Sequence, residues 1–202
     1  KSSEGLIPPF AFISIAEELG LIIPMTELAL DRGLADLNKW HEFAPEMFLS
    51  VNLSAQHFLK DSLVPYVSSL LKKHDFSPNI LTFEFPESAL ISEPEKAIST
   101  IKALSELGVT LALDDFGTGY SSLEYLKKLP LDIIKIDRSF VSGIGEEEAD
   151  EAIVDATLVL AKRLGMGCIA EGVETKAQLE YLTKQKCHLI QGYLFSKPVD
   201  RE

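Results

Sequence analysis

The chain has 202 residues, of which 46% are hydrophobic and 25% are charged, and its formal net charge is −12. This composition is typical of a soluble globular domain with one large core, and no apolar run reaches the roughly 18 residues of a membrane-spanning helix. The negative charge repels a DNA or RNA backbone, and no stripe of lysine and arginine offsets it. The first residues lack the pattern of a signal peptide. We therefore expect a cytoplasmic domain, or the cytosolic part of a larger membrane-anchored protein, that binds no nucleic acid polymer.

Short β-rich runs alternate along the chain with longer stretches of helical apolar spacing. The predicted strands are Met47–Leu53, Ile80–Phe85, Val109–Asp114, Leu131–Ile136, Met166–Glu171 and Cys187–Tyr193. Capping boxes that begin at Ser92 and Thr175 mark the starts of two intervening helices. Strands that alternate with helices through short links are typical of a parallel sheet with crossover connections. No Pro- or Ser-rich linker divides the chain, so we expect one domain over residues 1–202.

Each predicted strand ends with a polar side chain after an apolar run. These residues are Asn52, Glu84, Asp114, Lys135, Glu171 and Gln191. Because residues two apart in a strand share a face, the polar set converges on one interior and the alternating apolar residues point toward the helices. The alternation of elements alone fits an open doubly wound sheet or a closed barrel. Six polar strand ends favour a TIM-like (β/α)8 barrel with its site at the C-terminal mouth.

Four carboxylates lie at the C-terminal ends of these strands: Glu84, Asp114, Asp115 and Glu171. A single polar strand end is as often structural as functional, but this much negative charge in one place is unfavourable unless cations or protons neutralise it. Carboxylate and amide oxygens suit Mg²⁺ or Mn²⁺. The four histidines lie in predicted helices and loops or face outward, so we interpret them as structural. The two cysteines, Cys168 and Cys187, lie in apolar segments and are interpreted as core thiols.

Six sequence motifs carry a resemblance to a known family. They are VNLS (51–54), EFPES (84–88), LDDFGTGYSSL (113–123), KIDRSF (135–140), AEGVET (170–175) and QGYLFSKP (191–198). In this order they closely resemble the bacterial EAL-domain family of cyclic di-GMP phosphodiesterases, over essentially the whole chain. The resemblance implies hydrolysis of cyclic di-GMP to linear pGpG. It also implies a homodimer, and fusion to sensory or diguanylate-cyclase-like domains in the full-length protein.

The resemblance assigns two divalent metal ions, Mg²⁺ or Mn²⁺, to the site. Asn52, Glu84 and Asp114 are expected to bind the first ion. Asp114 is expected to bridge to a second ion, which Asp115 and Glu171 also bind. Two neighbouring ions can clamp the attacking and leaving oxygens of a phosphoryl displacement.

Further residues receive roles from the same resemblance. Glu171 is the expected general base, and Lys135 is expected to orient the attacking water or to stabilise developing charge. Gln191 and Asp115 are expected to contact the substrate. Glu87 is expected to anchor the loop 116–122, which leads toward the dimer interface in this family. Glu174 and Thr118 are expected to support the site in the same way.

Two departures from the family pattern affect these expectations. Pro86 stands where the family has threonine, and we expect only a small effect on loop packing. The chain also begins just downstream of the expected Glu-Ala-Leu segment, whose glutamate binds the first metal in this family. We therefore expect six of the eight βα units in this chain, and activity that depends on that glutamate. The alternatives are a catalytically inactive cyclic di-GMP receptor and a protein-interaction module.

Overall fold

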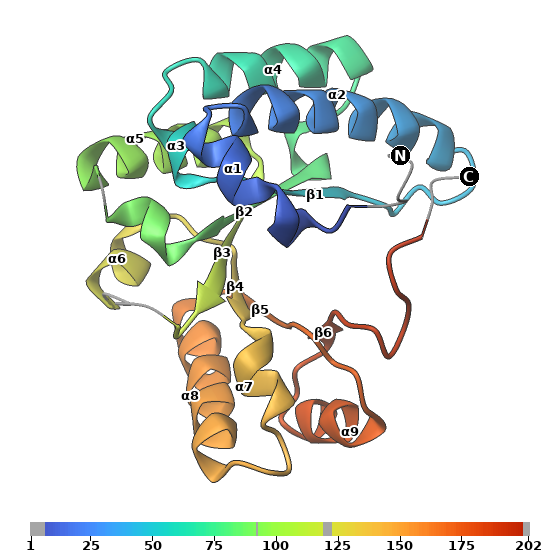
Figure 1. The fold of residues 1–202 in the computed structure, drawn as a ribbon, viewed down its shortest axis with the longest axis vertical. Helices are drawn as coiled ribbons and strands as arrows, with labels where there is room; N and C mark the ends of the chain where they lie inside the picture. Colours follow the sequence, from blue (N-terminus) through green and yellow to red (C-terminus); the bar gives the residue numbers. More distant parts are fainter. Residues whose placement is uncertain (1–6, 92, 119–122, 200–202) are drawn as a thin grey trace.

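Six parallel strands form the framework of the molecule, and helices connect each strand to the next (Figure 1). The computed structural model describes residues 7–91, 93–118 and 123–199. The strands lie side by side in chain order: β1 (Leu49–Asn52), β2 (Leu81–Pro86), β3 (Thr110–Phe116), β4 (Ile133–Ile136), β5 (Gly167–Ala170) and β6 (Leu189–Ile190). The sheet is curled, and with its helices it forms half of a TIM-like barrel. The predicted parallel barrel architecture is confirmed.

The helices follow the strands in the alternation that the sequence predicts. The longer ones are α2 (Ile22–Trp40), α4 (Leu63–His74), α5 (Pro94–Leu107), α8 (Glu148–Leu164) and α9 (Lys176–Lys184). The shorter ones are α1 (Ile13–Glu18), α3 (Ala55–Phe58), α6 (Leu123–Lys128) and α7 (Arg138–Ser142), with single 3₁₀ turns η1 (Pro9–Ala11), η2 (Pro78–Ile80) and η3 (Glu87–Leu90). No helix in the described ranges is long and apolar enough to cross a membrane.

The main core lies between the sheet and its helices. Phe83, Phe85 and Leu111 are completely buried there, together with Leu34 of α2 and Ile101 of α5. These strand residues belong to the face that the alternating pattern assigns to the helices. The prediction of an apolar outward face and a polar inward face is therefore confirmed for the central strands. A second, smaller cluster fills the space between β4–β6 and helices α7–α9.

The outermost strand, β6, differs most from its prediction. The predicted run Cys187–Tyr193 contains a strand of only two residues, Leu189–Ile190. Among the residues that the structure describes, β6 has one neighbour in the sheet, β5, with which it pairs in parallel. Beyond β6 the backbone turns to pair with the loop after β5, since Val173 N donates to Gln191 O (3.1 Å) and Leu194 N donates to Val173 O (3.0 Å). The polar residues after β6 therefore lie in a loop instead of a strand.

Two helix starts were predicted from capping boxes. The box at Thr175 is confirmed, because Gln178 N donates to Thr175 Oγ1 and Thr175 N donates to Gln178 Oε1. The other helix, α5, begins after Glu93 with Pro94 in its first turn. Ser92, the capping residue predicted there, lies outside the described residues.

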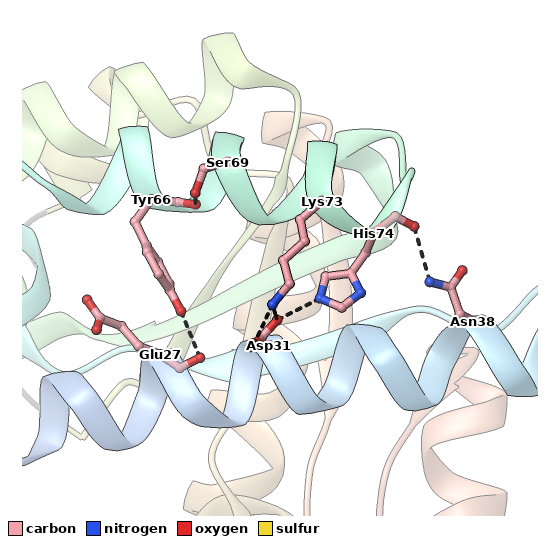
Figure 2. Close-up of polar contacts among 7 residues, drawn as sticks. All are labelled: Glu27, Asp31, Asn38, Tyr66, Ser69, Lys73 and His74. Carbon is pink, nitrogen blue, oxygen red and sulfur yellow. Dashed lines mark hydrogen bonds and ion pairs between the residues drawn. The ribbon is translucent and has the colours of Figure 1, made fainter.

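Polar contacts join α2 to α4 on the outside of the sheet (Figure 2). Lys73 Nζ and His74 Nε2 lie 2.7 and 2.6 Å from Asp31 Oδ1. The hydrogen bonds from Lys73 and His74 lower the pKa of Asp31. Tyr66 Oη donates to Glu27 O, 3.0 Å away. His74 thus joins two helices far from the strand ends, which agrees with its interpretation as structural.

Candidate functional site

The ammonium group of Lys135 is the centre of the polar strand ends. Its Nζ lies 2.5 Å from Glu171 Oε1 and 3.4 Å from Asp114 Oδ1, and it also donates a hydrogen bond to Glu84 Oε2. Lys135 is 2% exposed and Glu84 is 8% exposed. Four adjacent strands or strand ends, β2 to β5, therefore bring one cation and three carboxylates together. The sequence predicts that these residues meet, but it does not predict that Lys135 contacts all three carboxylates.

Strand register explains why these side chains meet. Glu84 pairs with Ala112 across β2 and β3, and Lys135 pairs with Ile169 across β4 and β5. These four side chains all point to the inner face of the sheet. Glu84 and Lys135 therefore face each other across the curled sheet. Ser50, two residues before the end of β1, donates a hydrogen bond from its Oγ to Glu84 Oε1. Ser50 lies two residues before Asn52 and so shares its face of β1, but it was not among the predicted site residues.

The end of β3 is irregular where the two aspartates lie. The register between β3 and β4 shifts between Leu113 and Phe116. Asp115 has a positive φ of 54°, and its backbone N–H donates to Asp114 Oδ1 (3.0 Å). Thr118 Oγ1 donates to the Asp115 carbonyl at 2.8 Å, so Thr118 closes this turn. Asp114 Oδ1 forms an ion pair with Lys135, whereas Asp115 is exposed and is affected by the Lys135 charge without forming such a pair.

Asp137 is a site residue that the sequence analysis did not single out. Its side chain is close enough to that of Asp115 for the two carboxyl groups to share a proton, and its carboxylate also caps α7 by accepting from Ser139 N at 2.9 Å. Burial raises the pKa of Asp115, and the neighbouring charges of Asp114 and Asp137 raise it further. The signal was present in the sequence, because Asp137 follows Lys135 by two residues and so continues the same face of β4.

Burial and neighbouring charges also shift the pKa values of Glu171 and Lys135. Burial raises the pKa of Glu171 to about 7, and the charges of Asp114 and Glu84 add to this effect, although the Lys135 hydrogen bond opposes it. Burial alone would lower the pKa of Lys135, but its hydrogen bonds to Glu171 and Glu84 outweigh this, and the pKa is raised. The lysine therefore stays charged at neutral pH, while Glu171 is close to the midpoint of its titration.

A pocket of about 470 Å³ opens beside this cluster. Its lining comes from the loop after β5, the segment after β6 and the first residue of α7, and it includes Arg138, Glu171, Glu174, Gln191, Tyr193 and Lys197. A volume of several hundred Å³ is typical of small-molecule sites. Glu171 belongs to both the pocket wall and the Lys135 cluster, so a ligand in the pocket would touch the cluster. Arg138, Tyr193 and Lys197 were not predicted as site residues.

The remaining predicted residues lie around this centre. Asn52 ends β1 in register with Glu84, and its side chain is exposed. Glu87 is half-buried in η3, directly after Pro86 at the end of β2. Part of the loop that Glu87 was predicted to anchor, residues 119–122, lies outside the described residues. Glu174 lines the pocket, and its backbone N–H donates to Gln178 Oε1 (2.9 Å).

The donor chemistry at the cluster suits a hard divalent cation, since it consists of carboxylate oxygens with the Asn52 amide nearby. In the described part of the chain, however, no group of three or more His, Cys, Asp or Glu side chains is arranged to hold a metal ion. The carboxylates are instead turned toward Lys135. The residue types therefore fit the predicted metals. In this arrangement the Lys135 ammonium neutralises the same carboxylate oxygens that would bind a metal ion.

The fold and this site define an α/β half barrel with an acidic, lysine-centred cluster at the C-terminal ends of its strands. Residues 1–198 match the family model described as the EAL domain. The chain therefore belongs to the EAL domain family.

Curated relatives and solved structures agree with this assignment. The chain is 39% identical over 199 residues to MucR of Pseudomonas aeruginosa, named a bifunctional diguanylate cyclase/cyclic di-GMP phosphodiesterase, and 40% identical over 198 residues to the cyclic di-GMP phosphodiesterase NbdA of the same organism. These alignments cover 98% of this chain but only 29% and 25% of the relatives, so the chain spans less than a third of their length.

Among solved structures, the PaMucR phosphodiesterase in complex with c-di-GMP superposes with a TM-score of 0.94 at 38% identity, covering 98% of this chain and 81% of that one. The EAL enzyme Bd1971, with cAMP and cyclic di-GMP bound, has a TM-score of 0.91 at 33% identity and covers 100% of this chain and 56% of that one. The half-barrel arrangement thus matches proteins described as EAL enzymes.

Proposed function

We propose that this chain hydrolyses one phosphodiester bond of cyclic di-GMP and releases linear pGpG, with Mg²⁺ or Mn²⁺ at the carboxylates. The observation that carries the proposal is the meeting of Lys135 with Glu84, Asp114 and Glu171 beside a ligand-sized pocket. Relatives of the same family are named cyclic di-GMP phosphodiesterases. In the reaction, the bond between phosphorus and O3′ breaks, water supplies the new oxygen on phosphorus, and O3′ receives a proton.

The residues of the cluster have chemistry that suits this hydrolysis. Glu171, with a pKa raised to about 7, can take a proton from the attacking water at neutral pH. Lys135 is a fixed, desolvated cation that can stabilise the negative charge of the transition state. Gln191 lies in the wall of the pocket, where it can contact the dinucleotide.

Oxygen donors for the metal ions are assigned from the same cluster. Asn52, Glu84 and Asp114 would hold one ion, and Asp114, Asp115 and Glu171 would hold the other. Bound divalent cations supply polarisation of the phosphoryl oxygens and a lowered pKa for a coordinated water. Glu87, Glu174 and Thr118 are proposed as supporting residues, of which Thr118 closes the turn at Asp115.

One observation favours a second function, that of a receptor that binds cyclic di-GMP without cleaving it. The three carboxylates of the cluster are turned to Lys135, and the described residues contain no ready metal-binding group. A cation would have to compete with a buried ammonium for the same oxygens.

The decisive experiment is incubation of the protein, with the Glu-Ala-Leu glutamate on which activity is expected to depend, with cyclic di-GMP and Mn²⁺ or Mg²⁺, followed by chromatography for pGpG. Metal-dependent pGpG that disappears in EDTA and in a Glu171→Gln variant supports the phosphodiesterase. Binding of cyclic di-GMP by calorimetry without pGpG supports the receptor. A protein that does neither is left with the third alternative, an interaction module.

A further inference from the structure

One buried ionisable side chain, His57, plays no part in the proposed hydrolysis. It belongs to α3, the short helix that follows β1, and only 2% of the residue is exposed. Its Nε2 is buried, and in the described part of the chain this atom meets no hydrogen-bond partner. A neutral imidazole tolerates such a place, whereas a charged ring there would lack both water and an acceptor for its proton.

The other ring nitrogen of His57, Nδ1, caps the start of α3. Ser54 N donates to His57 Nδ1 (3.1 Å), Ser54 Oγ lies 2.9 Å from the same atom, and His57 N donates to Ser54 O (3.0 Å). Nδ1 needs a lone pair to accept from Ser54 N, so the neutral ring has its proton on Nε2. A second proton would enter at Nδ1 and replace this acceptor with a donor. The cap therefore depends on a ring that stays neutral.

The capping box of α9 provides a matched contrast within the same molecule. There, Thr175 N donates to Gln178 Oε1 (3.0 Å), and the Gln178 side chain is buried. Glutamine or glutamate is the usual residue at this position of a capping box, and a glutamine amide does not titrate. In α3 a histidine takes the place of that glutamine. A proton can therefore open the box of α3 but not the box of α9.

The surroundings of His57 favour the neutral ring. The charged groups on the elements that contact α3, and in the link after it, are Glu17 and Glu18 on α1, Glu87 on η3, Glu95, Lys96, Lys102 and Glu106 on α5, and Lys60 and Asp61 before α4. None of them is among the causes that shift the pKa of His57. Burial lowers this pKa, and the backbone hydrogen bond with Ser54 opposes only part of the effect.

The helix that His57 caps joins several parts of the fold (Figure 1). Gln56 Nε2 donates to Glu17 O of α1, 2.7 Å away. Thr100 Oγ1 of α5 donates to Phe58 O (3.0 Å), and α3 also packs against η3. Loosening α3 would therefore free the connection that leaves β1 at the C-terminal ends of the strands.

We propose that His57 is a pH-sensitive latch, whose neutral ring holds α3 against α1, α5 and η3 and whose protonation in mildly acidic solution releases the helix. This latch needs neither a ligand nor a metal ion, so it goes beyond the proposed function and is independent of it.

The direction and size of the pH effect follow from proton linkage. The pKa of His57 lies below its ordinary value of 6.5 while α3 is closed, and returns to that value when the ring reaches water. The closed helix then binds fewer protons than the open one, so it loses stability as the pH falls below 6.5. Between pH 7.5 and pH 5.5, the ratio of open to closed α3 is expected to rise by about 5- to 10-fold.

The experiment is amide hydrogen exchange of the whole chain, followed by NMR in EDTA at pH 7.5, 6.5 and 5.5. Protection factors are compared, because they remove the intrinsic pH dependence of exchange. The amides of Ser54 and His57 are expected to lose about 5- to 10-fold in protection over this range. The amides of Thr175 and Gln178 are the control in the same samples, and they are expected to keep theirs.

Two variants identify the group that takes up the proton. His57→Gln keeps an acceptor for Ser54 N but does not titrate, so it is expected to abolish the loss of protection at Ser54. His188→Gln removes an exposed histidine before β6 and is expected to behave like the wild type.

A loss confined to the α3 box and absent from His57→Gln supports the latch. Equal changes at the α3 and α9 boxes of the wild type, or no change at Ser54, overturn it without recourse to any variant. A loss at Ser54 that persists in His57→Gln assigns the effect to another titrating group, which also overturns the latch.

Discussion

Replacement of Lys135 by methionine tests whether its ammonium is what allows three carboxylates to lie together. The change keeps the length of the side chain and removes the only cation of the cluster. Lys135 is 2% exposed, so water cannot take the place of the ammonium, and Glu84, Asp114 and Glu171 would be left with uncompensated charge. Removing one partner of a buried ion pair costs about 3–5 kcal/mol. For a domain of this size, that corresponds to a fall in Tm of about 6–20 °C.

The assay is thermal unfolding followed by far-UV circular dichroism in EDTA. Lys60→Met, at an exposed lysine between α3 and α4, is the control and is expected to change stability by no more than about 0.5 kcal/mol. Adding Mn²⁺ is expected to raise the Tm of Lys135→Met by more than that of the wild type, because the freed carboxylates can then bind the ion. A Tm of Lys135→Met within about 2 °C of the control would refute the reasoning, since the carboxylates would then need no counter-charge.

Four further changes have defined outcomes. Glu171→Gln is expected to abolish pGpG formation while calorimetry still detects cyclic di-GMP binding, and an unchanged rate would remove Glu171 from the mechanism. Burial raises the pKa of Glu171 from its ordinary value of 4.5 to about 7, so the folded protein keeps a proton that the unfolded chain releases in this range. The Tm in EDTA should therefore contain a contribution that declines from pH 4.5 to about 7, and Glu171→Gln should flatten that decline. Gly192→Ala is expected to destabilise the protein by about 1–3 kcal/mol in urea unfolding, because its Cβ meets the Val173 carbonyl. Asp31→Asn weakens the α2–α4 contacts with Lys73, and is expected to lower the Tm slightly without changing KM for cyclic di-GMP.

The strands and their inner face could be predicted because both follow from local periodicity. Alternation of side chains along a strand is enough to assign Glu84, Asp114 and Lys135 to one face and Phe83 to the other. The ends of parallel strands necessarily meet at one edge of the sheet, so the clustering of the polar strand-end residues followed from the topology. The family motifs then added the chemistry of the site, although they did not show which tips touch.

The contacts among the polar strand-end residues could not be predicted, because they depend on the curvature of the sheet and on the irregular end of β3. The register between β3 and β4 shifts after Leu113 and Asp115 has a positive φ, and neither spacing nor residue type predicts such an irregularity. Curvature brings Glu84 and Lys135 together, 51 residues apart in sequence. The sequence also did not predict the short β6, whose backbone leaves the sheet to pair with the loop at Val173. The segment after β6 forms part of the pocket wall, so Tyr193 was missed with it.

The charge balance of the cluster has a consequence for how cation and dinucleotide bind. One ammonium faces three carboxylates, and because the pKa of Glu171 is raised to about 7, this group carries between one and two net negative charges at neutral pH. A dianionic cyclic dinucleotide is repelled by that charge unless a cation is present. The cation must then raise the affinity for the dinucleotide, and by linkage the dinucleotide must raise the affinity for the cation by the same factor. Arg138 and Lys197 reduce this dependence on the cation in the pocket, because they supply positive charge from the protein. Weak binding in EDTA that strengthens with Mg²⁺ is therefore the expected behaviour of this site, whether or not it goes on to cleave the ligand.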